Sequence, residues 1–179
     1  YVMASTLSVS KIQGLSTAGD PTTVEIASGH KLTGAAGSIV APGQVIQLVQ
    51  QQTNTQFSTT SNPYVDTGFA ASITPKFSSS KIYVIAGLNM YNNATNGVSS
   101  TTLYRGGSRI SDSATYGHAY GYSNSGSHVQ HHTFTYLDSP NTTSSTEYKI
   151  YISCATNGGT LYMCINNSSS TLTLMEIAQ

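Results

Sequence analysis

Charge is the scarcest property of this 179-residue sequence. Only 8% of its residues are charged, seven basic and seven acidic, so the formal net charge is zero, whereas about 25% is usual for a soluble domain. A nucleic-acid-binding protein needs a stripe of Lys and Arg to displace counterions from phosphates. Seven scattered cations cannot form that stripe, so we expect no nucleic acid as a partner.

Long apolar runs are also missing. No segment approaches the roughly 18 apolar residues of a membrane span, and no basic segment followed by an apolar one resembles a secretory signal. We therefore expect no membrane insertion. The polarity comes instead from 27 Ser, 24 Thr and 11 Asn, while 12 Tyr and 4 Phe favour a folded chain over a disordered one.

Helical periodicity is the third absence. No window of 11 or more residues repeats apolar positions at helical spacing. Short runs rich in Val, Ile, Thr and Tyr alternate instead with Gly, Asn, Ser and Pro, which is typical of antiparallel sandwiches and barrels. The predicted strands are 43–51, 64–74, 80–91, 100–106, 114–122, 128–137, 146–155, 160–166 and 171–178. They predict an all-β fold, an antiparallel jelly-roll β-sandwich.

The first 42 residues differ from the rest. Their apolar positions are sparse and interrupted by glycines, too few to cover a core of their own. We predict a Gly-rich, extended segment over 1–42, ordered by wrapping with copies or by docking to a partner, and a sandwich over 43–179. Ala41-Pro42-Gly43 is the expected hinge, and a flexible tail is the alternative.

The clearest local pattern is a pair of alternating runs at 149–154 and 161–166. A two-residue turn at Gly158-Gly159 would join them as a hairpin with their apolar positions on one face. Cys154 is then a core thiol, Cys164 points to the other face, and no disulfide forms. A three-residue loop would set the two cysteines opposite each other.

Three histidines invite a metal interpretation. On a strand His128 and His132 share a face about 13 Å apart, and His131 points the other way, so one chain cannot close a zinc site. Three chains around an axis could, which makes His128 and His132 candidates for an axial ion. The alternative is packing with hydrogen-bonded nitrogens. We expect no cofactor.

Catalytic motifs are absent. Residues 121–126 place Ser125 where the second Gly of a G-x-S-x-G elbow should stand, and no two carboxylates form a sequence pair that suggests acid and base. Groups far apart in sequence can still meet in space. We predict a protein that is not an enzyme.

The best functional candidate is the segment 112–127. Tyr116, His118, Tyr120 and Tyr122 recur at every second residue, so an extended chain presents them on one face, with Asn124 beside them. Tyrosine offers a rigid amphipathic surface, and Ser, Gly and Asn add adaptable hydrogen bonds. This neutral surface suits sugar rings. Packing against the sandwich or a neighbouring subunit is the alternative.

Several phrases, taken in order, resemble small fibre-like virion proteins of marine bacteriophages. The phrases are 6–14 (TLSVSKIQG), 26–34 (IASGHKLTG), 43–47 (GQVIQ), 72–75 (SITP), 79–84 (SSKIYV), 103–108 (LYRGGS), 137–140 (LDSP) and 170–177 (STLTLMEI). The resemblance implies a homotrimeric tail fibre, head fibre or decoration protein with a jelly-roll head of the tumour-necrosis-factor/C1q type. The resemblance implies no catalytic residues. No phrase within 112–127 matches these proteins.

Trimer formation is also expected from the strands themselves. Strands 80–91 and 171–178 are apolar on both faces, so each must be covered twice, and in a closed assembly the second cover is another subunit. We therefore expect a homotrimeric protein of the virion surface, bound to other virion proteins through 1–42 and to host-surface polysaccharide through its head. The alternatives are a structural decoration or cement protein, a glycan depolymerase, and a secreted C1q-like ligand.

Overall fold

The structure is a computed structural model of the chain that describes residues 28–34, 39–110, 116–155 and 159–179. The chain divides into two units, Tyr1–Ala35 and Ala36–Gln179. In the first unit, residues 28–34 are exposed and contain a turn but no strand. Most of the predicted segment 1–42 lies outside the described residues, so its boundary and its role stay predictions.

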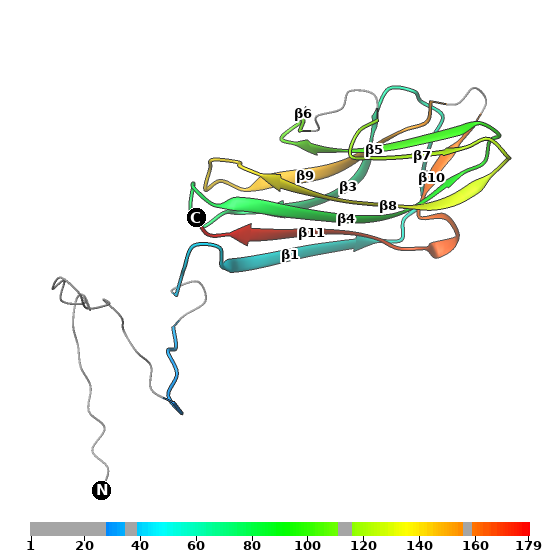
Figure 1. Cartoon of the computed structure of the whole chain (residues 1–179). Coiled ribbons are helices and arrows are strands. Elements are labelled where there is room, and N and C mark those ends of the chain that lie inside the picture. The colour runs from blue at the N-terminus through cyan, green and yellow to red at the C-terminus, as the bar shows by residue number, and fades with distance from the viewer. Residues whose placement is uncertain (1–27, 35–38, 111–115, 156–158) are drawn as a thin grey trace, which may run out of the picture. The chain divides into compact units, whose positions relative to one another are not determined.

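The second unit holds two antiparallel sheets packed face to face, which confirms the predicted all-β sandwich (Figure 1). Sheet A contains β1 (Val45–Thr53), β2 (Phe57–Thr59), β4 (Lys81–Asn92), β8 (His128–Asp138), β10 (Leu161–Met163) and β11 (Ser170–Ile177). Sheet B contains β3 (Val65–Ile73), β5 (Gly97–Arg105), β6 (Ser108–Arg109), β7 (Ala119–Ser123) and β9 (Thr146–Ser153). Helical structure in the described part is limited to a 3-10 turn at Ile165–Asn167.

The connections are those of a jelly roll. The long strands lie in the order β1-β11-β4-β8 in sheet A and β3-β9-β5-β7 in sheet B. The chain crosses from one sheet to the other between β2 and β3, β3 and β4, β4 and β5, β7 and β8, β8 and β9, and β9 and β10. Two sheets of four long strands joined by such crossings form the eight-stranded jelly roll. Of the short strands, β10 pairs with β4 and β2 in sheet A, and β6 pairs with β5 in sheet B.

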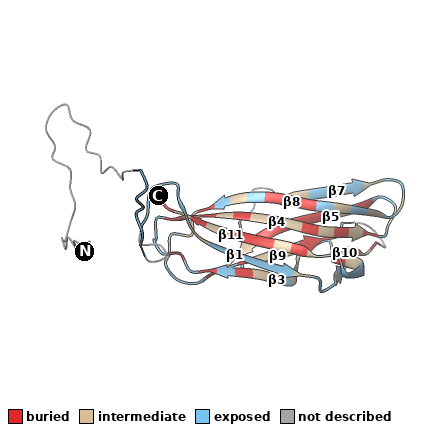
Figure 2. Ribbon diagram, turned by 90° about the horizontal axis from the view of Figure 1, so that it is seen from below, coloured by how far each residue is buried: buried red, intermediate tan, exposed pale blue. Residues whose placement is uncertain are grey.

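Strand β4 shows why these residues form a sandwich. Its odd and even positions alternate along its whole length, and every second side chain from Ile82 to Met90 is at most 1% exposed (Figure 2). Successive side chains of a strand point to opposite faces, so one face of β4 belongs to the core between the sheets. The other face carries the half-buried Tyr83, Ile85 and Tyr91.

The predicted hairpin between 146–155 and 160–166 is wrong. Strand β9 pairs with β3 and β5 in sheet B, whereas β10 pairs with β2 and β4 in sheet A. Both strands alternate because both turn an apolar face to the same core, from opposite sides. Of the two predicted turn residues, Gly158 lies outside the described residues and Gly159 precedes β10 without belonging to a strand.

The two cysteines are free and buried, which confirms the prediction that they form no disulfide. Cys154 lies in the core, but the prediction that Cys164 points to the opposite face is wrong. Strand β10 ends at Met163, and the backbone of Cys164 is left-handed, with φ of 58°. The Cys164 thiol is buried 3.1 Å from the hydroxyl of Ser170.

The interior is polar on the side where β8 faces β5 and β7. Two side-chain contacts satisfy buried polar groups there: Gln130 donates to the hydroxyl of Ser99, and Thr101 Oγ1 lies 2.7 Å from His132 Nδ1. Gly121 on β7 lies against Gln130, and a Cβ atom there would lie 1.6 Å from the Gln130 side-chain oxygen. A larger residue would displace the Gln130 amide.

Two carboxylates of sheet A are buried, Asp138 at the end of β8 and Glu176 on β11. Asp138 accepts a 2.6 Å hydrogen bond from Tyr148 and pairs with Arg105 at 2.5 Å. Burial, and then the bond to Asp138, raise the pKa of Tyr148, so the phenol stays protonated. Glu176 is fully buried on β11 and accepts hydrogen bonds from Gln47 and from the backbone N–H of Lys76.

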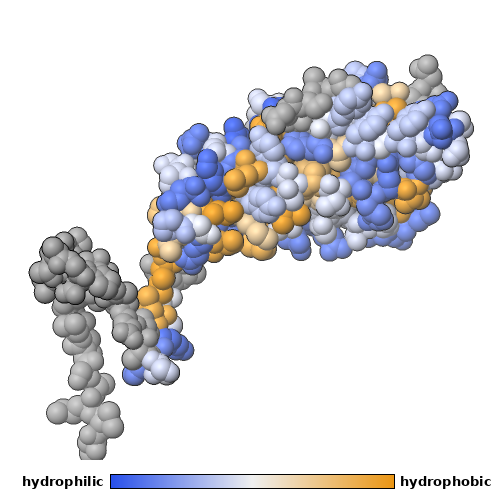
Figure 3. Space-filling model, viewed as in Figure 1, coloured by the Kyte–Doolittle hydropathy of each residue, from blue (hydrophilic) through white to orange (hydrophobic). Residues whose placement is uncertain are grey.

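The outer face of sheet A carries an apolar row across four strands. Leu48 on β1 pairs with Met175, Met175 with Tyr83, and Tyr83 with Leu137. Leu48 and Leu137 are both more than half exposed. Apolar residues gather at the end of the head where β1 begins and β11 ends (Figure 3). This apolar row is the second face that the sequence predicts to be covered.

Candidate functional site

Two of the predicted binding tyrosines lie on β7 and point outward. Tyr120 pairs with Ser100 and Tyr122 with Val98 on β5, and their side chains are 44% and 52% exposed. Tyr116, which precedes β7, is 54% exposed and meets the Tyr120 ring edge to face at 4.7 Å. The three tyrosines therefore form an exposed aromatic surface on the outer side of sheet B.

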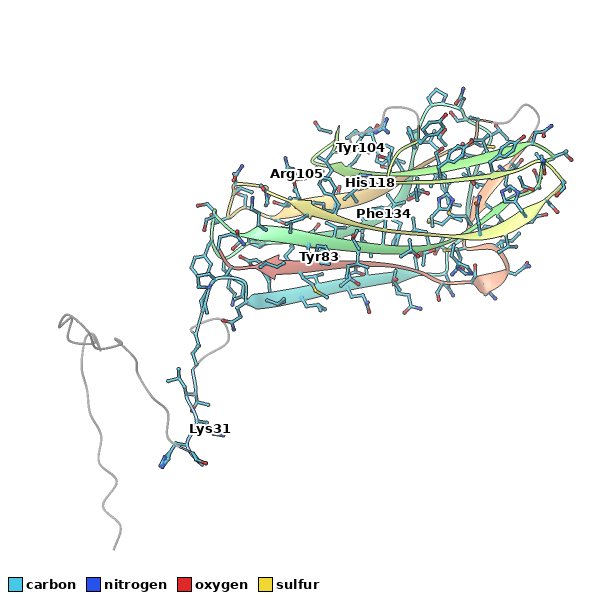
Figure 4. The ribbon with its side chains drawn as sticks, in the orientation of Figure 1. Lys31, Tyr83, Tyr104, Arg105, His118 and Phe134 are labelled. Carbon is cyan, nitrogen blue, oxygen red and sulfur yellow. The ribbon has the colours of Figure 1, made fainter. Side chains whose placement is uncertain are left out.

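His118 does not join this surface, so the prediction of four rings on one face is wrong for it. Its ring lies 4.8 Å from Phe134 and 5.1 Å from Tyr136, both on β8 of the other sheet (Figure 4). The backbone N–H of Leu103 donates to His118 Nδ1 at 3.3 Å. His118 closes the edge of the sandwich between the sheets.

The alternation fails at Gly117. Its φ of +65° lies in the left-handed region that favours glycine. A Cβ atom there would lie 2.3 Å from the Thr101 carbonyl oxygen and 2.8 Å from the Tyr64 hydroxyl. The regular alternation of side chains between the two faces is therefore interrupted just before β7. His118 therefore turns inward while Tyr116 and Tyr120 remain outside.

A pocket of about 450 Å³ opens beside Tyr116 and Tyr120. The remaining lining residues come from three other segments and are Asn62, Pro63, Tyr64, Val98, Ser153 and Ala155. None of the lining residues carries a formal charge. An apolar and aromatic wall with a few polar groups is the usual composition of a ligand site.

The segment before β3 is held in place as one wall of this pocket. The Cys154 N–H donates to the Ser61 carbonyl oxygen at 2.7 Å, and the Ser153 hydroxyl donates to the Asn62 carbonyl oxygen. These bonds fix Tyr64 across from Tyr116. The sequence interpretation missed this wall, because it lies more than 50 residues from Tyr116 and shows only a turn signal, Asn62-Pro63.

The other two predicted site residues lie beside the pocket rather than in it. The Tyr122 hydroxyl donates to the Asn96 side-chain oxygen at 3.0 Å. Asn124 is exposed in the connection between β7 and β8. Neither residue lines the pocket, and their predicted binding role stays a prediction.

The histidines of β8 lie on two faces of the strand, as their spacing predicts. The axial-ion candidates His128 and His132 lie on the inner face, which cannot meet other chains. His132 is 3% exposed between the sheets, His128 is half-buried on the same face, and His131 is exposed on the outer face. Burial, and then the nearby His128, lower the pKa of His132 to about 4. A residue sealed inside the sandwich cannot share an ion with two other chains. Across the described residues no cluster of three His, Cys, Asp or Glu side chains could hold a metal.

The described carboxylates are committed to structural contacts. Asp138 and Glu176 are buried in the bonds given above, and Asp66 and Glu147 both contact Lys149, at 3.2 and 3.3 Å. No carboxylate lines the pocket. The pocket therefore offers ring faces, an amide and hydroxyls to a ligand, without the acid and base pair that glycoside hydrolysis uses.

Comparison with known proteins finds similarity at the level of structure but not of sequence family. No protein-family model matches this chain, and no curated protein matches it. Among solved structures it is similar to the VP2 subviral particle of infectious bursal disease virus, with 14% identity and a TM-score of 0.41. The match covers 83% of this chain and 42% of that chain, so this chain spans less than half of that viral particle protein. No helix in the described residues has the length and apolar character of a membrane span.

Proposed function

We propose that this chain is a non-enzymatic surface protein of a bacteriophage particle, a fibre or fibre tip whose head binds a host-surface polysaccharide. The observation that carries the proposal is the uncharged pocket between Tyr64, Tyr116 and Tyr120. The C–H face of a sugar ring stacks on an aromatic ring, and sugar hydroxyls bond to a polar side chain such as the exposed amide of Asn62. A tyrosine serves both needs, since its ring is apolar and its hydroxyl is polar.

The position of the pocket within the head fits a fibre tip. The chain enters the sandwich at Gly43 and Gln44, which are bonded to Ala178 at 2.8 and 2.9 Å beside the start of β1. The pocket residues Asn62 and Ala155 follow strands that run away from that end. Nine residues of β1 span about 30 Å. A particle attached through 1–42 would thus present the pocket at the opposite end.

A homotrimer is part of the proposal. Another copy of the chain would cover the apolar row on the outer face of sheet A, which consists of Leu48, Met175, Tyr83 and Leu137. Exposed apolar surface of this kind marks interaction sites, and closed symmetry covers it on every copy. Three pockets on a trimer, repeated over a particle, raise a weak single-site affinity through effective concentration.

The test is adsorption of particles that carry Tyr116→Ala with Tyr120→Ala. Because both side chains are about half exposed, we expect a strong loss of adsorption with an almost unchanged melting temperature and an unchanged native mass. The double Tyr→Phe variant keeps both rings and is the matched control, with adsorption near the parent level. Normal adsorption of the Ala variant would place the binding surface elsewhere, and its unfolding or dissociation would show that the rings serve packing.

A further inference from the structure

A second aromatic cluster lies on the same outer face of sheet B. The ring of Tyr104 on β5 (Figure 4) stacks on the ring of Tyr151 on β9, with centroids 3.8 Å apart and planes 18° apart. Both are half-buried. Strand pairing sets Thr102 opposite Tyr151 and Ser100 opposite Ser153, so this stacked pair follows the pocket along the same two strands.

Arg109 links the pocket wall to the strand that carries Tyr104. Its guanidinium lies over the Tyr64 ring at 4.6 Å, and its Nε donates to Thr102 Oγ1 at 3.2 Å. Thr102 is completely buried and is paired with Tyr151 on β9. Contacts through Arg109 and Thr102 therefore connect Tyr64 in the pocket wall with the position of the stacked pair.

The spacing suits more than one sugar. Tyr120 is paired with Ser100, and Tyr104 lies four residues further along β5, a distance of about 13 Å along the strand. That is longer than a single pyranose ring. Two charged side chains lie in this region: Arg109 is engaged with the Tyr64 ring and Thr102, and Lys149 contacts Asp66 and Glu147. Because these charges are already held by protein contacts, a neutral chain suits the region.

We propose that the outer face of sheet B is one elongated site for an internal stretch of a neutral polysaccharide. One sugar occupies the pocket at Tyr116 and Tyr120, and a later sugar of the same chain lies against Tyr104 and Tyr151. The inference rests on the proposed function and deepens it, because a site of this shape selects chain interior rather than chain ends.

The experiment measures affinity against chain length on the full-length protein. The probes are linear neutral glucan and mannan oligosaccharides, from disaccharides to octasaccharides, with a uronic-acid series beside them. We expect the affinity for one neutral series to rise until both clusters are spanned. Tyr151→Ala should leave the shortest binding oligosaccharide unaffected and weaken the longest about tenfold, the size of one lost aromatic contact.

Controls separate this inference from the proposed function. Tyr151→Phe keeps the stacked ring and should retain the parental length dependence, and melting curves identify any variant that is misfolded. Binding without length dependence, or an equal loss at every length in Tyr151→Ala, would overturn the elongated site and leave the pocket standing. Binding only to the uronic-acid series would overturn the neutral ligand, and no binding to any series would overturn the pocket and the elongated site together.

Discussion

His132 makes the sandwich sensitive to mild acid. The imidazole is sealed between β8 and β5, its Nδ1 is bonded to Thr101, and its Nε2 is buried without a partner. The pKa of the folded-state imidazole is lowered from 6.5 to about 4, chiefly by burial. The unfolded chain takes up a proton as the pH falls below 6.5, whereas the folded chain stays neutral until about pH 4. Stability is therefore lost as the pH falls through this window.

The size of the loss follows from the two pKa values. One pKa unit is worth about 1.4 kcal/mol, so the full loss approaches about 3 kcal/mol near pH 4, and about 2 kcal/mol is already lost at pH 5. The hydrogen bonds to Glu176 outweigh its burial and lower the pKa of that carboxylate below 4.5. Its stabilisation is therefore lost only at lower pH. The interval between about pH 6.5 and about pH 5 reports on His132.

The assay is urea unfolding at about pH 7.5 and about pH 5, at one fixed protein concentration because oligomers gain stability with concentration. The parent should lose about 2 kcal/mol between the two conditions, and His132→Gln should lose far less, because glutamine does not titrate. His30→Gln makes the same change at an exposed residue and should behave as the parent. An identical loss in the parent and in His132→Gln would refute the reasoning.

The remaining predictions concern packing, the thiols and the N-terminal segment. Gly117→Ala should lower the free energy of unfolding by about 2 kcal/mol, since its φ is +65° and its Cβ would lie 2.3 Å from the Thr101 backbone oxygen, and an unchanged denaturation midpoint would contradict this. Glu176→Gln should lower the melting temperature at neutral pH and shrink the loss of stability below about pH 4.5; equal melting curves for parent and variant across that range would oppose it. Cys154 and Cys164 should alkylate slowly in the native protein, and a non-reducing peptide map with a bridge between them would overturn the assignment. Deletion of 1–42 should leave cooperative unfolding intact while abolishing attachment to the particle, and loss of cooperativity would assign that segment to the core.

The hydrophobic periodicity predicted which face of each strand is buried better than it predicted which strands pair with one another. The alternation in β4 and β11 correctly identified an inner and an outer face, because burial against one core imposes a period of two on each strand separately. The same rule misassigned β9 and β10. Two strands that face one core from opposite sheets alternate just as two strands of a hairpin do.

The candidate site was predicted in part for a related reason. Tyr120 and Tyr122 are outward-facing because their alternation holds along β7. Tyr116 and His118 precede β7, where the left-handed backbone at Gly117 breaks the alternation, and His118 lies in the sandwich. Tyr64 was not found from the sequence. It reaches the pocket through the packing of the segment before β3 against the end of β9, and no local pattern encodes that contact.

We propose that the two outer faces have different roles, sheet A closing a trimer and sheet B remaining open to ligand. Hydroxyl-radical footprinting of the native protein at micromolar concentration tests this directly, because Leu48, Leu137, Tyr116, Tyr120 and Tyr122 are all more than 40% exposed on a single chain. We predict that Leu48 and Leu137 are protected while the three tyrosines react. Equal reactivity of both sets, or protection of the tyrosines with Leu48 and Leu137 reactive, would contradict the proposal.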